Sequence, residues 1–128
     1  MQVNEISGVV LDESIRLHRE VGPGVLESVY EAVLAKRLER RGLFVERQKV
    51  VPLAIDGEQF GEVFRIDLLV NRYVVVELKS VEELHPVHFK QVLTYLRLLK
   101  LPLGLLINFG EPTLKGGFHR IVNNLRET

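Results

Sequence analysis

The sequence predicts an α/β domain in which a mixed β-sheet is flanked by helices. Two helix-like segments open the chain, three strand-like segments follow, and a further helix-like segment leads into two short strand-like ones. Residues 103–108 are nearly all apolar, which is typical of a strand covered on both faces. A chain of 128 residues is long enough for one domain with its own core, so we expect residues 1–128 to form a single unit.

Breaker residues mark the ends of the two N-terminal helices. The first helix is predicted over residues 7–20 and ends before the Gly-Pro-Gly sequence at residues 22–24. The second is predicted over residues 26–41, and Gly42 fits the position that follows a helix C-terminus.

Turn signals divide the middle of the chain into three strands. Residues 44–55 and 59–70 flank Asp56-Gly57, which is a hairpin turn sequence, and residues 73–79 form the next strand. Further on, Pro86 can open a helix that extends to about residue 100. A final edge strand is expected at residues 118–122.

The composition is that of a soluble globular protein, and it limits the chemistry. The chain has 17 basic and 17 acidic residues, whereas proteins that coat nucleic acid are usually basic. Any contact with nucleic acid is therefore expected to be local or metal-assisted. The absence of cysteine excludes disulfides, thiolate zinc sites and iron–sulfur clusters formed by this chain.

Several common sequence signals are missing. No apolar run approaches the roughly 18–20 residues that span a bilayer, and residues 1–6 lack the basic start of a signal peptide. We therefore expect a cytoplasmic protein with no membrane partner. The sequence has no phosphate-binding G-x-x-x-x-G-K-[ST] loop, no G-x-G-x-x-G fingerprint and no G-x-S-x-G elbow. The sequence therefore has none of the usual motifs of nucleotide-driven or acyl-transfer chemistry.

The most informative residues lie on the hairpin that residues 64–70 and 74–79 form. With a loop of three residues at its end, Asp67 faces Glu77 on one side, and Lys79 points to the same side. A slip of one residue would bring charges onto the apolar side, so the pattern itself selects this register. The apolar side would hold Ile66, Leu68, Val70, Val74, Val76 and Leu78.

Two facing carboxylates need a proton or a cation between them. Asp67 and Glu77 would otherwise repel each other, because directly opposed Cβ atoms lie only about 4.5–5.5 Å apart. A hard ion such as Mg²⁺ accepts one or two carboxylates and keeps several waters. The alternative is that Lys79 pairs with both carboxylates in a purely structural cluster, and the hairpin alone does not separate the two.

Helical residues supply further candidates for the same site. Glu27 begins an apolar stripe that continues through Tyr30, so it either complements the helix dipole or reaches the carboxylates. Gln91 and Tyr95 share a face of the later helix, opposite a face with Phe89, Leu93 and Leu96. That helix would offer Gln91 and Tyr95 to a cleft, unless they are ordinary surface residues.

Five motifs occur in order along the chain. They are G-x-x-E-x-x-Y at residues 24–30, RIDLLV at 65–70, VELK at 76–79, QVLTYL at 91–96 and GLLINFG at 104–110. Together they resemble the GxxExxY proteins, a family of the PD-(D/E)xK nuclease superfamily. The resemblance extends from about residue 11 to residue 123, although Ile66 stands where the superfamily motif has its proline.

The resemblance implies a restriction-endonuclease-like αβββαβ core with a metal site on its central hairpin. Asp67 would be the motif aspartate, and Glu77 and Lys79 the E-x-K pair. Glu27 would be the helix-borne acidic residue, and Gln91 the polar residue of the following helix. Asp67, Glu77 and Glu27 would bind Mg²⁺ or Mn²⁺. Tyr30 and Tyr95 would support the site.

The sequence therefore predicts a metal-dependent nuclease that hydrolyses phosphodiester bonds in DNA or RNA. One alternative is a non-catalytic nucleic-acid-binding or regulatory module that retains the nuclease fold. Another is a homo-oligomer, because the helix that begins at Pro86 is apolar over much of its circumference. Metal-dependent turnover would distinguish the nuclease from both.

Overall fold

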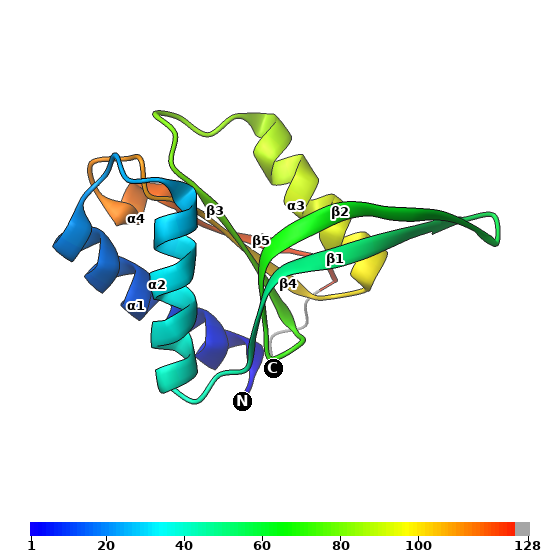
Figure 1. Cartoon of the computed structure of the whole chain (residues 1–128), viewed down its shortest axis with the longest axis horizontal. Helices are drawn as coiled ribbons and strands as arrows, with labels where there is room; N and C mark the ends of the chain where they lie inside the picture. The colour runs from blue at the N-terminus through cyan, green and yellow to red at the C-terminus, as the bar shows by residue number, and fades with distance from the viewer. Residues whose placement is uncertain (125–128) are drawn as a thin grey trace.

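The computed structural model describes residues 1–124 and is built on a mixed sheet with the strand order β1-β2-β3-β4-β5 (Figure 1). Strands β3 and β4 are parallel, and the other neighbours are antiparallel. The mixed sheet and its flanking helices confirm the predicted α/β fold. The strands are β1 (Val45–Ile55), β2 (Glu58–Val70), β3 (Val74–Lys79), β4 (Leu103–Asn108) and β5 (Phe118–Val122).

Helices cover both faces of this sheet. The helices α1 (Val3–Val21) and α2 (Glu27–Arg40) pack together on one face (Figure 1). On the other face α3 (Pro86–Leu99) connects β3 to β4, which is the crossover that parallel neighbours require. Helix α1 begins at Val3 rather than at residue 7. A short helix, α4 (Leu114–Gly117), precedes β5 and was not predicted. Within residues 1–124 no helix is long and apolar enough to cross a membrane.

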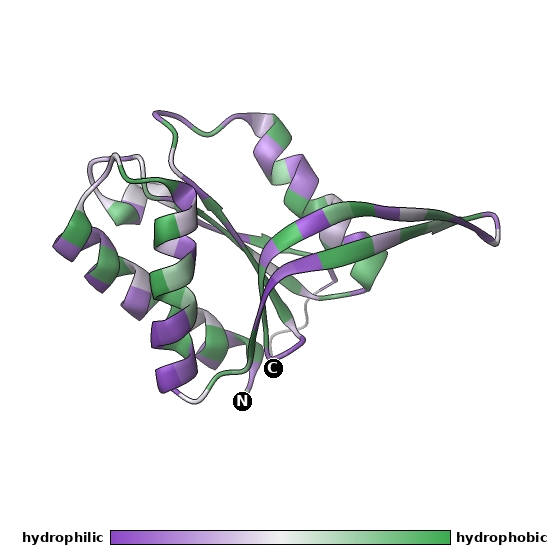
Figure 2. Cartoon of the chain, viewed as in Figure 1, coloured by the Kyte–Doolittle hydropathy of each residue, from purple (hydrophilic) through white to green (hydrophobic). Residues whose placement is uncertain are grey.

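The core is divided by the sheet into two hydrophobic clusters. One joins α1 and α2 to the sheet and includes Leu34, Leu68 and Val76. The other lies under α3 and includes Val75 and Leu96. All residues of β4 are buried, as expected for a strand covered on both faces. The strands at the centre of the sheet are mostly hydrophobic (Figure 2).

The pairing of β2 with β3 follows the predicted register. Leu68 lies opposite Val76, and Val70 lies opposite Val74. The prediction for Ile66 is wrong, because this residue packs under α3 rather than beside Leu68. Side chains alternate along a regular strand, so the alternation must be interrupted near Asp67, where the pairing with β3 ends. The neighbouring Gln48 of β1 has a positive φ of 49°, which marks the same irregularity.

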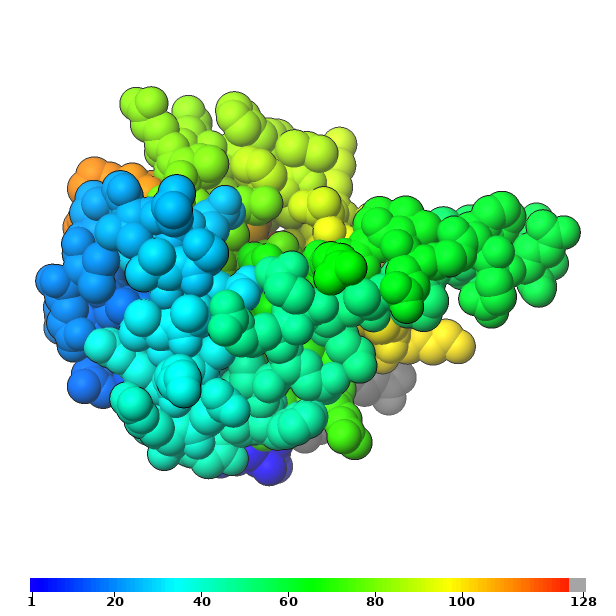
Figure 3. Space-filling model, viewed as in Figure 1, coloured from blue at the N-terminus to red at the C-terminus, as the bar shows by residue number. Residues whose placement is uncertain are grey.

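The hairpin of β1 and β2 projects from the body of the molecule (Figures 1 and 3). Its turn is Asp56-Gly57, and both residues have positive φ, as the sequence predicts for a hairpin with this turn. Phe60 near the tip is 56% exposed. The base of the same hairpin carries the polar residues described next.

Candidate active site

Asp67 and Glu77 lie where β2 and β3 separate, and they hold the two strands together. The backbone N–H of Asp67 donates to Glu77 Oε1 at 2.8 Å. The backbone N–H of Leu78 donates to Asp67 Oδ2, also at 2.8 Å. Each carboxylate therefore accepts a hydrogen bond from the opposite strand in place of a backbone carbonyl. The two residues are adjacent, as predicted, although the regular pairing of the strands ends one residue earlier, at Leu68 and Val76.

Burial and mutual repulsion make both carboxyl groups reluctant to ionise. Burial, followed by the charge of Asp67, raises the pKa of Glu77 to about 8. Burial is also the main reason why the pKa of Asp67 is raised. Lys79 acts in the opposite direction on both pKa values, yet among residues 1–124 neither carboxylate has an ion-pair partner within 4.0 Å. The structural cluster in which Lys79 pairs with both carboxylates is therefore not formed.

A third carboxylate, Glu31 of α2, lies next to this pair. Its Oε1 accepts a hydrogen bond from Gln48 Nε2 at 2.6 Å, and Gln48 Nε2 also lies 3.3 Å from Asp67 Oδ1. Arg47 forms an ion pair with Glu31 at 3.0 Å. The charge of Glu31 contributes to the raised pKa of both Asp67 and Glu77. Glu31 was not among the residues predicted from the sequence, although it stands four residues after Glu27 and thus on the same side of the helix.

Glu27 does not occupy the place predicted for it. Its side chain is exposed at the start of α2, whereas we expected it to turn from solvent toward Asp67 and Glu77. Burial is the main reason why the pKa of His88 of α3 is lowered, and the charge of Glu27 opposes this shift. The apolar stripe that it begins is buried as predicted, so the difference is one helical turn: Glu31, not Glu27, stands beside the pair.

The oxygen donors of the pair fit a divalent metal ion. Two carboxylates that lie close together are the oxygen ligands that Mg²⁺ accepts, with water completing the shell. A dication would also relieve the repulsion that raises the pKa of Glu77. Within residues 1–124, however, no three His, Asp or Glu side chains are grouped closely enough to hold a metal, so the set Asp67, Glu77 and Glu27 is not assembled.

A comparison with protein families identifies the superfamily of this chain. The model of the PD-(D/E)XK nuclease superfamily matches residues 4–121. The chain belongs to the PD-(D/E)XK nuclease superfamily. No curated protein and no solved structure shows significant similarity to it. Its fold is thus a restriction-endonuclease-like fold. Superfamily membership connects the chain with nuclease activity, divalent metal ions and nucleic acid.

In this member of the superfamily, Tyr30 lies in the core rather than in the cleft. Its hydroxyl donates to the carbonyl of Gly22 and accepts from the N–H of Val25. Its ring stacks on Phe109, with 4.3 Å between centroids. Tyr30 therefore fixes the loop that precedes α2, and through that loop it positions Glu27.

The two predicted residues of α3 lie along a groove beside the carboxylates. Gln91 is exposed and lines this groove, which fits both the predicted role at a cleft and an ordinary surface position. Tyr95 also lines it but is only 3% exposed and belongs to the cluster under α3, so it is not simply presented to a cleft. The inward face of α3 is made by Val92, Tyr95 and Leu96, and Phe89 and Leu93 are only partly buried.

The strand end after Glu77 is held by the next strand. The backbone carbonyl of Lys79 accepts a hydrogen bond from Phe109 N at 2.8 Å. The fully buried Asn108 accepts from the N–H groups of Val81 and Gly110. These bonds fix the backbone on which Lys79 stands.

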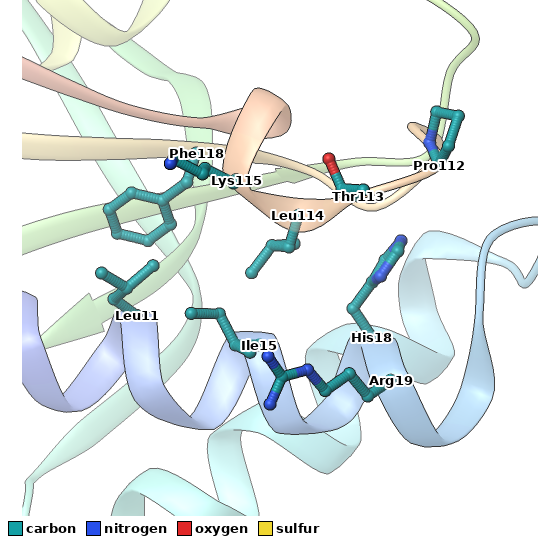
Figure 4. Close-up of a pocket in the computed structure, with 9 residues that line it drawn as sticks. All are labelled: Leu11, Ile15, His18, Arg19, Pro112, Thr113, Leu114, Lys115 and Phe118. Atoms are coloured by element: carbon teal, nitrogen blue, oxygen red, sulfur yellow. The ribbon is translucent and has the colours of Figure 1, made fainter.

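A second cavity, of about 540 Å³, lies between α1 and α4 and is separate from the carboxylate pair. Leu11 and Ile15 of α1 face Leu114 and Phe118 across it (Figure 4). None of the predicted site residues lines it, so it takes no part in the candidate active site.

Proposed function

We propose that this protein is a metal-dependent nuclease that hydrolyses phosphodiester bonds, with Asp67 and Glu77 as its metal ligands. The observation that supports this most is the pair formed by the buried Glu77 and the half-buried Asp67, which has no basic partner in residues 1–124 and lies at the separating strands of a PD-(D/E)XK fold. Backbone carbonyls usually join neighbouring strands, so the hydrogen bonds between β2 and β3 do not by themselves require two acidic side chains at this point.

Each residue of the proposed site has a chemical role. Asp67 and Glu77 would hold Mg²⁺ or Mn²⁺, with the carbonyl of Leu78 as a further oxygen donor. Such an ion, when bound, lowers the pKa of a water ligand and neutralises charge on a phosphoryl oxygen. Lys79 would orient that water, help to deprotonate it and stabilise the charge that grows on the phosphate.

The surrounding residues would position ligands and substrate. Gln48 and Glu31 connect α2 to Asp67 and would orient its carboxylate, in the way that outer-shell partners orient metal ligands. Glu27, exposed at the start of α2, would support an ion through water. Gln91 would position the attacking water or the strand, with Tyr95 behind it.

We also infer that the chain is a GxxExxY protein. The motif at residues 24–30 supports this subfamily, because its tyrosine fixes the loop that carries its glutamate. A cytoplasmic location suits a nucleic-acid substrate. A homo-oligomer is a further proposal, and it follows from the apolar character of α3 noted in the sequence.

The decisive experiment is a cleavage assay on single-stranded DNA, duplex DNA and RNA with Mg²⁺, Mn²⁺ or a chelator. We expect cleavage that requires a metal and is lost in Lys79→Ala. Cleavage that is equal in the wild type and in Lys79→Ala would indicate a contaminating nuclease. Nucleic-acid binding that survives chelation, with no cleavage under any condition, would instead favour the non-catalytic binding module.

A further inference from the structure

A groove of about 510 Å³ runs along α3 beside the candidate active site. One wall is Phe64 of β2, and the other is formed by residues of α3 that include His88, Lys90, Gln91, Thr94 and Tyr95. The space-filling view shows the molecule hollowed between α2 and α3, above the central strands (Figure 3). Nothing in the proposed hydrolysis accounts for the aromatic wall of this groove.

Strand β2 connects the groove with the carboxylate pair. Phe64 stands three residues before Asp67 on the same strand. Burial, together with the charges of Glu77 and Asp67, raises the pKa of Tyr95 to about 12. Burial is the main reason why the pKa of His88 is lowered, and the charge of Lys79 adds to this shift. Three residues span about 10 Å along an extended strand, and Tyr95 of the groove packs in the same hydrophobic cluster as Val75, which stands two residues before Glu77. A strand whose phosphate lies at Asp67 and Glu77 therefore has its neighbouring nucleotide within reach of the groove.

The lining matches the chemistry of a nucleobase. The ring of Phe64 is partly exposed and rests at 58° against the buried ring of Tyr95, with 5.5 Å between centroids. Gln91 offers both an amide donor and an acceptor. Within residues 1–124 no acidic side chain lines the groove, and Lys90 adds a positive charge for a phosphate. His88 Nδ1 accepts a hydrogen bond from His85 N at 3.1 Å, so its Nε2 carries the proton and can donate.

We propose that this groove binds an unpaired nucleobase next to the cleaved phosphodiester, by stacking on Phe64 and hydrogen bonding to Gln91. The proposal rests on the proposed function and adds the substrate class, namely single-stranded or locally unpaired nucleic acid. A base inside a duplex is stacked and paired, so it cannot enter such a groove without being extruded. Stacking on an aromatic side chain tolerates any base sequence, so the preference concerns strand form and not sequence.

The test measures binding of labelled oligonucleotides to the Lys79→Ala protein in Mg²⁺. This variant is used because it should not cleave the strand. We expect the single strand to bind more tightly than the same strand in a duplex. Replacing bases one at a time by an abasic spacer, with all phosphates kept, should weaken binding roughly 5- to 100-fold at one position. Adding Phe64→Leu, which keeps apolar bulk but removes the ring, should abolish the effect of that spacer.

The control is Phe60→Leu, the same substitution on the exposed part of the projecting hairpin. It should leave the spacer effect unchanged. Equal binding of duplex and single strand, no sensitive position, or a spacer effect that survives Phe64→Leu would each overturn the groove proposal. In those cases metal-dependent cleavage by the wild type would still support the nuclease. Absence of both binding and cleavage would overturn both proposals.

Discussion

At the scale of single residues, the site depends on Asp67 and Glu77 accepting hydrogen bonds from each other's strands. These bonds favour the charged forms, whereas burial and repulsion favour the neutral forms. For Glu77 burial and repulsion outweigh the hydrogen bond, and its pKa is raised to about 8. A metal ligand must be deprotonated, so ion binding and proton release are coupled at this residue.

The metal-free protein should therefore lose stability as the pH rises from about 5 to about 8. The pKa of Glu77 rises from 4.5 to about 8 on folding, so in this window the folded protein holds a proton that the unfolded chain has released. Glu77→Gln should flatten the dependence, and thermal denaturation across this range measures it. The exposed Glu39→Gln on α2 is the control and should keep the wild-type slope. A Glu77→Gln profile with the wild-type slope would contradict the assignment.

Asp67→Asn and Lys79→Ala should affect metal binding in opposite ways. Asp67→Asn removes a ligand charge, so Mn²⁺ affinity should fall by more than the roughly 10- to 100-fold that loss of an outer-shell partner costs. Lys79→Ala removes a positive neighbour, so binding should persist or tighten while cleavage is lost. Titration calorimetry with Mn²⁺ compares both variants with the wild type. Negligible binding by all three proteins would mean that the pair is structural.

At the scale of secondary-structure elements, α2 and α3 form the two sides of the site, and each makes a specific contact with a strand in addition to its packing in the core. Glu31 ties α2 to β1 through Arg47 and Gln48. Gly104 of β4 allows α3 to lie close to the sheet. A Cβ atom at this position would lie 2.5 Å from Val92 Cγ1.

Glu31→Gln and Glu27→Gln test which turn of α2 serves the metal. Because Glu31 is linked to Asp67 through Gln48, its neutralisation should weaken Mn²⁺ binding roughly 10- to 100-fold. Glu27→Gln should have the smaller effect, since its side chain is exposed. Titration calorimetry with Mn²⁺ on Glu31→Gln and Glu27→Gln measures which substitution weakens binding more. The reverse order would restore Glu27 as the helix-borne ligand that the sequence predicted.

Gly104→Ala should destabilise the protein by about 1–3 kcal/mol, because the added methyl group overpacks the contact between β4 and α3. Gly8→Ala is a matched control, since nothing lies within 4 Å of the Cβ it would add on α1. In a helix that change should stabilise by roughly 0.5–1 kcal/mol. Denaturant unfolding of both variants gives the two free energies. Equal effects would show that α3 is free to shift away from β4.

At the scale of the whole molecule, metal binding should be visible as folding stability. The proposed ligands come from two strands, which only the folded chain brings together, so Mg²⁺ or Mn²⁺ should stabilise the folded state by mass action. At 100 times its Kd an ion contributes about 2.7 kcal/mol, and scanning calorimetry would record a higher melting temperature. A chelator should reverse the increase. An equal increase in Asp67→Asn would place the ion elsewhere.

Much of this molecule follows from local patterns in its sequence. The register from Leu68 and Val76 to the loop follows from alternation with a period of two, and it brings Asp67 beside Glu77. The buried stripe of α2 follows from helical periodicity in the same way. These features depend only on residues near one another along the chain or joined by one tight turn.

Other features depended on how the elements pack, and only the tertiary structure decided them. Periodicity places Glu27 and Glu31 on the same side of α2. The position of α2 along the sheet determines that Glu31, rather than Glu27, is linked to Asp67 through Gln48. Ile66 turned to the other face because the strands separate at Asp67. Gly104 lets α3 lie close to β4, and the groove lies between this helix and Phe64. Local sequence determines which face a side chain occupies, whereas distances between elements arise from the packing of the whole core.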